Sequence, residues 1–482
     1  MKMPATAYKH LHDENVSSKK PTSCVILAVV MACLTVLGII LAIAILERPS
    51  SSDKIDGEKI FPLEPSVGSC SMTLVESIPV YMKYNDNATF GRPLETVWED
   101  LIAMATEQLD VVSFYWTLTG ADISVNSSSA IPGTRILTGL ESLPARNVSV
   151  RVLISNPSVH TNSTDLKVLQ QKGVQVREVD FGRLTDGVLH SKFWIVDRKH
   201  LFIGSPNMDW RALTQVKELG VVIHNCSELA IDLEKIFNSY WEMGLPNSTL
   251  PDPWPSKYDT NITKLHPLLV KEENITSQIY ISGSPPLFCP LSRTLDLDAI
   301  LTSISEAQHY VDVAVMEYLP LIQFEKPQRY WSVLDDAIRA AAFDRKVKIR
   351  MLISCGRESN PSVLPFLQSL AALDSNISHI SIKIKLFIVP VGNQTDIPYS
   401  RVNHNKYMVT DKVAYIGTSN WSGDYFTTTG GVGLVISQHA PHLIWKKSIQ
   451  SQLSVVFERD WNSQFAVYLD ELGHHPDCAL VK

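Results

Sequence analysis

The stretches HSKFWIVD at residues 190–197 and HNKYMVTD at residues 404–411 are two copies of one pattern. Each copy has a His, a Lys two positions later and an Asp after four more residues. A glycine and then an asparagine follow each copy, and these are Gly204 with Asn207 and Gly417 with Asn420. The apolar interior of each copy predicts a buried strand. Because strand side chains alternate, the His and the Lys of one copy should point to the same side.

The two patterns belong to a longer internal duplication, because shorter blocks repeat in the same order before each of them. The paired blocks are 109–112 with 311–314, 148–155 with 347–354, and 174–177 with 382–385. They are short and β-branched, which predicts strands, and helices are expected between them at 164–172, 332–343 and 363–373. Strands that alternate with helices indicate an α/β sheet in each half. We therefore predict two tandem α/β sandwich halves, related by pseudo-twofold symmetry, that share one active site.

An uncharged run of 23 residues, from Cys24 to Leu46, is long enough to cross a bilayer. Lys19 and Lys20 precede this run, so the positive-inside bias places the N-terminus in the cytosol. We predict a single-pass protein whose segments are a cytosolic tail at 1–23, a transmembrane signal anchor at 24–46, a luminal stalk at 47–70, the first half at 71–275 and the second half at 276–482.

Two features of the chain after the anchor agree with a location in the lumen. Sequons for N-glycosylation are dense there, and they begin at Asn87, Asn126, Asn147, Asn162, Asn225, Asn247, Asn261, Asn274, Asn376 and Asn393. The cysteines suggest two disulfides and one free thiol in an oxidising compartment, with the pairing left open among Cys70, Cys226, Cys289, Cys355 and Cys478. The net charge of −7 argues against the large basic face of a duplex-DNA binder.

The two motif histidines suit a reaction at a phosphodiester. One of His190 and His404 can attack phosphorus while the other protonates the leaving oxygen, and a lone histidine would lack that acid. Lys192 and Lys406 can neutralise the phosphate oxygens. The predicted reaction is a double displacement through a phosphohistidine, with overall retention at phosphorus.

The remaining motif residues have supporting roles. The amides of Asn207 and Asn420 can donate to the phosphate. Asp197 and Asp411 complete each motif as catalytic candidates, but their odd spacing from the His indicates a structural role equally well. No clustered Cys/His or acidic pattern predicts a metal site, so we expect catalysis that requires no cofactor.

The two halves differ at one position that matters for this chemistry. Eleven residues after Asn207 stands Glu218, whereas eleven residues after Asn420 stands Gly431. A nearby carboxylate raises the pKa of an imidazole. If Glu218 lies beside His190, then His190 is the general acid and His404 is the nucleophile.

Aromatic residues crowd the motif regions. Tyr115, Trp116, Trp210 and Trp421 are candidates for stacking against the bases of single-stranded nucleic acid, and lipid chains would suit the same surface. Core packing is the alternative for such residues, and it is favoured for Trp194, which lies inside an apolar strand.

The paired motifs with their downstream glycine and asparagine resemble those of the phospholipase D superfamily, over residues from about 71 to 482. The chain is similar in particular to the type II membrane branch formed by vertebrate members three and four. That likeness is carried by residues 74–79, 187–194, 208–211, 214–220 and 401–404. Member four is favoured by residues 120–123 and 387–393.

The resemblance implies a lysosomal and late endosomal 5′-to-3′ exonuclease, delivered through the endoplasmic reticulum and the Golgi, that degrades single-stranded DNA and RNA. Such an enzyme would limit nucleic-acid sensing by endosomal receptors. The resemblance also implies that Cys70 pairs with Cys226 and Cys355 with Cys478, which leaves Cys289 unpaired. Whether the chain forms a homodimer is left open.

Two other interpretations remain at this point. One is a phospholipid phosphodiesterase or transphosphatidylase, including bis(monoacylglycero)phosphate formation, with phospholipid as the partner. The other is an inactive luminal glycoprotein scaffold, which is disfavoured because every motif residue is present.

Overall fold

The computed structural model describes residues 70–158, 163–439, 441, 445–473 and 475–480. The predicted tail, the predicted anchor and the stalk as far as residue 69 lie outside the described residues. Within the described part, no helix is both long enough and apolar enough to span a bilayer. The described residues all belong to one compact unit.

The first sheet has eight strands in the part of the chain that the structure describes. Its spatial order is β2 (Arg92–Pro93), β1 (Ser71–Ser77), β10 (Glu218–His224), β8 (His200–Gly204), β7 (Phe193–Val196), β3 (Gln108–Val112), β5 (Ser149–Asn156) and β6 (Gln175–Asp180). β3, β5 and β6 run parallel, whereas β1, β10, β8, β7 and β3 pair antiparallel in succession. The sheet is therefore mixed.

The second sheet has nine strands among the described residues. Its order is β11 (Leu268–Glu272), β12 (Ile275–Ser284), β22 (Gly431–His439), β20 (Ala414–Gly417), β19 (Lys406–Thr410), β13 (Tyr310–Val315), β17 (Lys348–Cys355), β18 (Ile382–Ile388) and β23 (Ala466–Tyr468). From β12 to β18 the parallel and antiparallel pairings match those from β1 to β6 in the first sheet, strand for strand. The repeated sequence blocks thus occupy equivalent strands.

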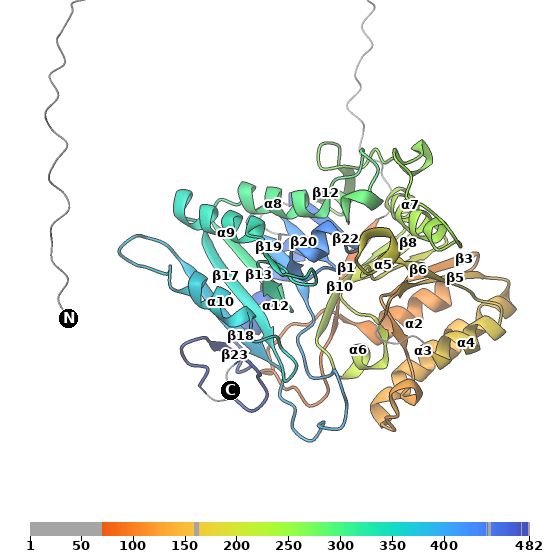
Figure 1. The fold of residues 1–482 in the computed structure, drawn as a ribbon, viewed down its shortest axis with the longest axis horizontal. Helices are drawn as coiled ribbons and strands as arrows, with labels where there is room; N and C mark the ends of the chain where they lie inside the picture. The colour runs from red at the N-terminus through yellow and green to blue at the C-terminus, as the bar shows by residue number, and fades with distance from the viewer. Residues whose placement is uncertain (1–69, 159–162, 440, 442–444, 474, 481–482) are drawn as a thin grey trace, which may run out of the picture. The chain divides into compact units, whose positions relative to one another are not determined.

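Helices pack on both sheets (Figure 1). Clusters of buried hydrophobic side chains fill the layers between them. One cluster joins the first sheet to α2 (Leu94–Met104), α3 (Ile131–Ser142) and α4 (Thr164–Gln171). A second cluster joins the second sheet to α8 (Asp296–Glu306), α9 (Val333–Asp344) and α10 (Val363–Ala371). A third contains side chains of both sheets together with α7 (Ser227–Met243) and α12 (Ile449–Trp461). The two sheets therefore pack against each other through a common core.

Short elements lie before and after each motif in the chain, and some of them pair with one another. In the first half these are β4 (Trp116–Thr117), which pairs with β9 (Met208–Asp209), and α6 (Trp210–Thr214). In the second half they are β14 (Tyr318–Leu319), which pairs with β21 (Trp421–Ser422), and α11 (Asp424–Thr427). A hairpin of β15 (Leu321–Ile322) and β16 (Arg329–Tyr330) follows β14, and α5 (Phe181–Thr185) precedes the first motif.

The predicted α/β architecture is confirmed. The predicted helices correspond to α4, α9 and α10, and the motif strands correspond to β7 and β19. Gly173 follows α4 with a φ of 101°, a left-handed conformation that glycine adopts without the steric cost of a Cβ atom.

Candidate active site

The first motif histidine is held by the backbone of the second half. His190 precedes β7, and its backbone N–H donates to the carbonyl of Gly430 at 2.8 Å. Nδ1 of its ring lies 2.9 Å from the carbonyl oxygen of Thr418. Because a carbonyl oxygen can only accept, Nδ1 carries the proton and Nε2 keeps its lone pair. The ring is thus oriented with a basic nitrogen free for chemistry.

The second motif histidine is held in the same way by the first half. The backbone N–H of His404 donates to the carbonyl of Lys217 at 2.8 Å. Nδ1 of its ring lies 2.9 Å and 3.0 Å from the two carboxylate oxygens of Glu218. The structure therefore brings the two motifs together, because each histidine takes its partners from the opposite half.

The prediction that Glu218 lies beside His190 was wrong. Lys217 forms a parallel bridge with Asn403, so the next residue, Glu218, comes alongside His404 instead. The hydroxyl of Ser205 donates a hydrogen bond of 2.5 Å to Oε2 of Glu218 and so helps to hold the carboxylate in place. Since the ring of His404 lies against this carboxylate, Glu218 stabilises the protonated form of that ring.

The second half has no room for a matching carboxylate. A Cβ atom on Gly431 would come within 2.4 Å of the Ser419 hydroxyl oxygen and within 2.8 Å of that of Ser284. His190 therefore has a neutral carbonyl as its Nδ1 partner, whereas His404 has an anion. The site is electrostatically asymmetric despite the matched sheets.

A buried cluster of charges holds the Lys217 segment in place. Nζ of Lys217 lies 2.7 Å from Asp460, which is on α12 of the second half, and 3.7 Å from Glu76 on β1. Arg459 pairs with the same Glu76 at 2.7 Å. These ion pairs join residues of both halves directly behind the backbone that accepts the hydrogen bond from His404.

The two motif lysines are buried close to the histidines. Nζ of Lys192 donates to the carbonyl of His190 at 2.5 Å, and Nζ of Lys406 donates to that of His404 at 2.8 Å. Burial lowers the pKa of Lys406 to about 7, against the opposing charges of Glu218 and Glu317. Burial and the charge of Lys406 hold the pKa of Lys192 well below its usual range. A bound phosphate would supply the negative charge that favours both ammonium groups.

Burial and nearby charges also affect the pKa values of the two motif histidines, and they do so to different extents. Burial lowers the pKa of His190 well below its usual range, and the charges of Lys192, Lys406 and His404 lower it further. Burial also lowers the pKa of His404, but the charge of Glu218 and its hydrogen bond act in the opposite direction. His190 is thus the more strongly deprotonated imidazole.

Asp197 and Asp411 hold backbone rather than the imidazoles. Asp197 accepts hydrogen bonds of 2.8 to 2.9 Å from three backbone N–H groups at residues 106–108, where β3 begins. Asp411 accepts from the N–H groups of Gln308 and His309 at 2.9 and 3.0 Å, just before β13. Each carboxylate thus ties the end of its motif strand to the start of the neighbouring strand, which is a structural role.

The asparagines retain unused hydrogen-bonding capacity. Oδ1 of Asn207 and Oδ1 of Asn420 are buried and lack a partner among the described residues, and Nδ2 of Asn420 donates to the hydroxyl of Tyr425 at 3.2 Å. Both polar atoms of the Asn405 side chain are likewise buried without a partner in the described part. The sequence analysis did not select Asn405, and no signal in the motif distinguishes it from Ser191 at the matching position.

The predicted stacking tryptophans are not available to a substrate. Trp116, Trp210 and Trp421 are at most 2% exposed, because β4, α6 and β21 bury them in the core. That prediction was wrong for all three. Tyr115 is half-buried, and its hydroxyl donates to Asp209 at 2.8 Å.

Two other aromatic rings flank His190. The ring centroids of Phe114 and Tyr425 lie 5.3 and 5.1 Å from that of His190. Phe114 was not predicted. It is adjacent to Tyr115, and the sequence does not show which of the two side chains points toward His190. The rings border the imidazole and limit its movement.

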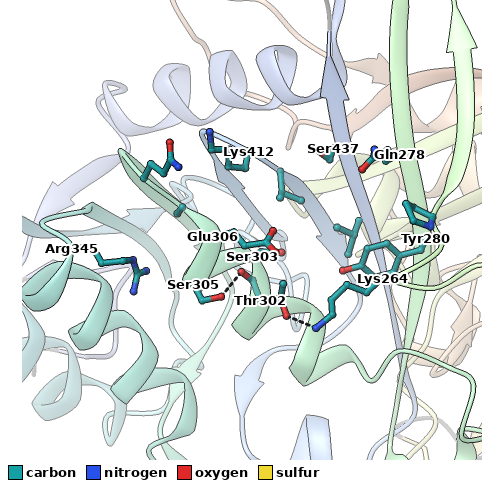
Figure 2. A pocket seen from close by; sticks show the side chains of 15 residues that line it. Lys264, Gln278, Tyr280, Thr302, Ser303, Ser305, Glu306, Arg345, Lys412 and Ser437 are labelled. Atoms are coloured by element: carbon teal, nitrogen blue, oxygen red, sulfur yellow. Dashed lines mark hydrogen bonds between the residues drawn. The ribbon is translucent and has the colours of Figure 1, made fainter. Parts of the chain in front are cut away.

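Two of the cavities in the described part of the chain are lined by residues close to the second motif. A cavity of about 220 Å³ is lined by Met316, Val402 and the 71% exposed Tyr399, among others, and its lining ends two residues before His404. A larger cavity of about 770 Å³ lies between α8, β12 and β22 and includes no motif residue (Figure 2). It is lined by Lys412, which follows the last residue of β19, whereas His404 precedes the first residue of that strand. The larger cavity is therefore not part of the histidine site.

Both predicted disulfides are present. Cys70 is bonded to Cys226, and Cys355 is bonded to Cys478. Cys289 is a free thiol. The first bond ties the start of β1 to the start of α7, and the second ties the end of β17 to the C-terminal segment.

Comparison with solved structures supports the class of fold. Phosphatidylserine synthase from Haemophilus influenzae Rd KW20 superimposes with a TM-score of 0.51 at 14% sequence identity, over 79% of this chain and 86% of that one. At this identity the likeness concerns the fold alone.

Comparison with sequences defines the family. The model of the PLD3/4, PLD-like domain matches residues 85–392. The human 5′-3′ exonuclease PLD4 is 48% identical over 410 residues, which cover 85% of this chain and 81% of the relative. The Xenopus tropicalis 5′-3′ exonuclease PLD3 is 50% identical over 398 residues, which cover 82% and 80%. The chain belongs to the PLD3/4 family of phospholipase-D-like proteins.

Proposed function

We propose that this chain is a 5′-3′ exonuclease that hydrolyses single-stranded DNA and RNA. The relatives named above carry that activity in their names. The observation that carries the proposal is that the ring of each motif histidine, His190 and His404, is hydrogen-bonded to a residue of the opposite half. The buried Lys192 and Lys406 lie next to these histidines. Two imidazoles and two cations in one site are the groups that a metal-independent transfer at phosphorus requires.

In the proposed reaction, His190 is the nucleophile. Nε2 of His190 attacks phosphorus, a phosphorus–nitrogen bond forms, and the bond to the leaving oxygen breaks. His404 donates its Nε2 proton to that oxygen, and Glu218 stabilises the imidazolium before the transfer. In the second step His404 takes a proton from water, the water oxygen attacks phosphorus, and His190 leaves. Two in-line displacements retain the configuration at phosphorus.

This assignment reverses the one expected from the sequence, for an electrostatic reason. The carbonyl of Thr418 keeps Nε2 of His190 unprotonated, and burial with the neighbouring cations disfavours its imidazolium. Glu218 favours the imidazolium of His404. A low pKa suits the nucleophile and a carboxylate partner suits the acid.

The test is digestion of end-labelled single-stranded oligonucleotides by the purified protein, with and without a chelator, alongside phosphatidylcholine as the lipid substrate. Stepwise release of nucleotides from the 5′ end, unaffected by the chelator, is expected. Release of the lipid headgroup without nucleotide release would instead support the phospholipid alternative. Loss of nuclease activity in the chelator would refute the cofactor-free mechanism.

We also propose that the chain has two halves related by pseudo-twofold symmetry around this site. The predicted boundary at residues 275 and 276 is too late, because β11 (Leu268–Glu272) pairs with β12 in the second sheet. The matched strand order and pairing sense of the two sheets support the symmetry. The contacts of each histidine with the opposite half support a shared site. Mutation of either histidine should therefore abolish activity altogether rather than halve it.

We propose further that residues 24–46 anchor the chain in the membrane, with the remainder in the lumen of lysosomes and late endosomes. The uncharged run and the preceding lysines support the anchor. The two disulfides and the exposure of all the predicted sequon asparagines that the structure describes support the lumen. Asn420, which also starts a sequon, is only 6% exposed. Glycosidase sensitivity combined with protease protection in sealed vesicles tests this topology.

A further inference from the structure

A third cavity, of about 600 Å³, lies where the two halves meet and includes no motif residue. One wall is the segment 83–89, which follows β1 in the first half. The other wall consists of the C-terminal part of α12 and the residues just after it, in the second half. Sites that bind small molecules commonly have volumes of about 300–1,000 Å³. The cavity is therefore large enough for a ligand that touches both halves.

The segment 83–89 is held against the second half at both ends. The amide of Gln464 donates to the carbonyl of Lys83 at 3.3 Å. At the other end, Arg459 donates to the carbonyl of Thr89 at 3.0 Å. The residues between these contacts thus form a short loop at the cavity, with both of its ends fixed to the second half.

A glycosylation sequon lies in this loop. It consists of Asn87, Ala88 and Thr89, and Asn87 is exposed and lines the cavity. The N–H of Ala88 donates to the carbonyl of Asn85 at 2.9 Å, which closes a tight turn around Asn87. None of the other predicted sequon asparagines that the structure describes lines this cavity. A glycan on Asn87 would therefore begin at the edge of the cavity.

The wall formed by the second half carries groups that can bind sugars. Glu458, Asn462 and Gln464 line the cavity and are exposed. A carboxylate accepts hydrogen bonds from sugar hydroxyls, and an amide both donates and accepts. Val455 is 45% exposed and adds an apolar contact. The wall thus combines hydrogen-bonding and apolar surface within reach of the sequon.

The cavity also borders the buried charge cluster that joins the halves. Arg459 lines the cavity, and its 5% exposed side chain pairs with Glu76 and Asp460. The same two carboxylates pair with Lys217, whose carbonyl accepts the hydrogen bond from the backbone of His404. Opposite charges attract more strongly where water is excluded. An occupant of the cavity would therefore strengthen ion pairs between the halves.

We propose that the first sugars of an N-linked glycan on Asn87 occupy this cavity and hold the two halves together. This inference rests on the proposed luminal location and not on the exonuclease function. During attachment Nδ2 of Asn87 loses a proton and bonds to the anomeric carbon of the first sugar, while the bond from that carbon to the diphosphate of the sugar donor breaks. Because the glycan is then tethered beside the cavity, its effective concentration there is high and weak contacts are sufficient.

The test uses the full chain purified from cells that glycosylate secretory proteins. The folded protein is treated with an amidase that removes N-glycans, and mass spectrometry follows release from Asn87 and from the other occupied sequons, such as Asn376. Asn376 is exposed and does not line the cavity. Release from Asn87 should be about tenfold slower or more, because the glycan must first leave the cavity. The difference should vanish when the protein is denatured before treatment.

Two substitutions remove the glycan in different ways. Asn87→Gln removes its attachment point, whereas Thr89→Ala removes the second recognition residue and keeps Asn87. Both should lower the melting temperature by about 2–4 °C and increase hydrogen exchange in 83–89 and at the end of α12. Asn376→Gln is the matched control and should change neither.

The possible results distinguish this inference from the proposal on which it rests. Equal rates of release from Asn87 and Asn376, or two glycan-free variants as stable as the wild type, would overturn the inference. An unoccupied Asn87 beside other occupied sequons would overturn it as well and leave the luminal location standing. A chain without any N-glycan would refute the luminal location itself.

Discussion

Glu218→Gln tests the contact between the two halves most directly. Both carboxylate oxygens of Glu218 lie within 3.0 Å of Nδ1 of His404, so the substitution removes the charge while retaining size and an acceptor. A hydrogen bond to a charged group contributes about 1.5–3 kcal/mol, and one pKa unit corresponds to about 1.4 kcal/mol. We therefore expect the pKa of His404 to fall by roughly one to two units.

The direction of the pH effect follows from the role of His404 as the acid. Without the anion, the imidazolium of His404 loses its proton at lower pH, so activity disappears first on the neutral side of the profile. The decrease in kcat/KM there should be about 10- to 100-fold, and the basic limb should move to lower pH by the same one to two units. At the most acidic pH the variant should approach the wild type.

The assay is the rate of nucleotide release from an end-labelled single-stranded oligonucleotide over a pH series. Ser205→Ala is the matched control, because it removes a donor to Glu218 but leaves the charge in place. It should shift the profile much less. A Glu218→Gln variant with the wild-type melting temperature and an unshifted profile would refute the assignment of His404 as the acid.

Three further predictions address the nucleophile and the stability of the fold. Brief incubation of the wild-type protein with labelled substrate, followed by rapid quenching, should trap the labelled phosphoryl group on His190, as located by peptide mapping; label on another residue would contradict the mechanism. Cys355→Ser should destabilise the protein by about 3–5 kcal/mol in denaturant unfolding, because its bond to Cys478 closes a loop with a sequence separation of 123. Lys217→Met removes one of the two buried cations that pair with Asp460 and leaves only Arg459, so unfolding should become easier by up to about 3–5 kcal/mol, and an unchanged midpoint would show that the charge cluster does not hold the halves together.

The sequence alone was sufficient for the fold class and for the central residues of the site. The short apolar runs in 193–196 and 407–409 are a local property of the chain, and they predicted strands that the structure has as β7 and β19. Duplication of the blocks predicted equivalent strands in two sheets. The period of two within each motif placed His190 with Lys192 and His404 with Lys406, and the structure bonds each lysine to the carbonyl of its own histidine.

These sequence patterns could not predict which side chains are buried or which residues of the two halves are in contact. Trp210 follows a motif asparagine in what reads as a loop, yet α6 carries it into the core. Glu317 has no motif around it, and it reaches the site only because its backbone pairs with the segment at Trp421. Such placements depend on how whole elements pack against each other.

The same limit explains the reversed assignment of the two histidines. Spacing relates Glu218 to the motif of its own half, but the carboxylate meets His404, which lies 186 positions away. Residue patterns report the local conformation of the backbone, whereas the partner of a side chain at an interface is decided by the docking of the two sheets. The chain thus determined by itself which groups perform the chemistry, and only the tertiary structure decided which imidazole carries the proton, because that depends on the charge placed beside it.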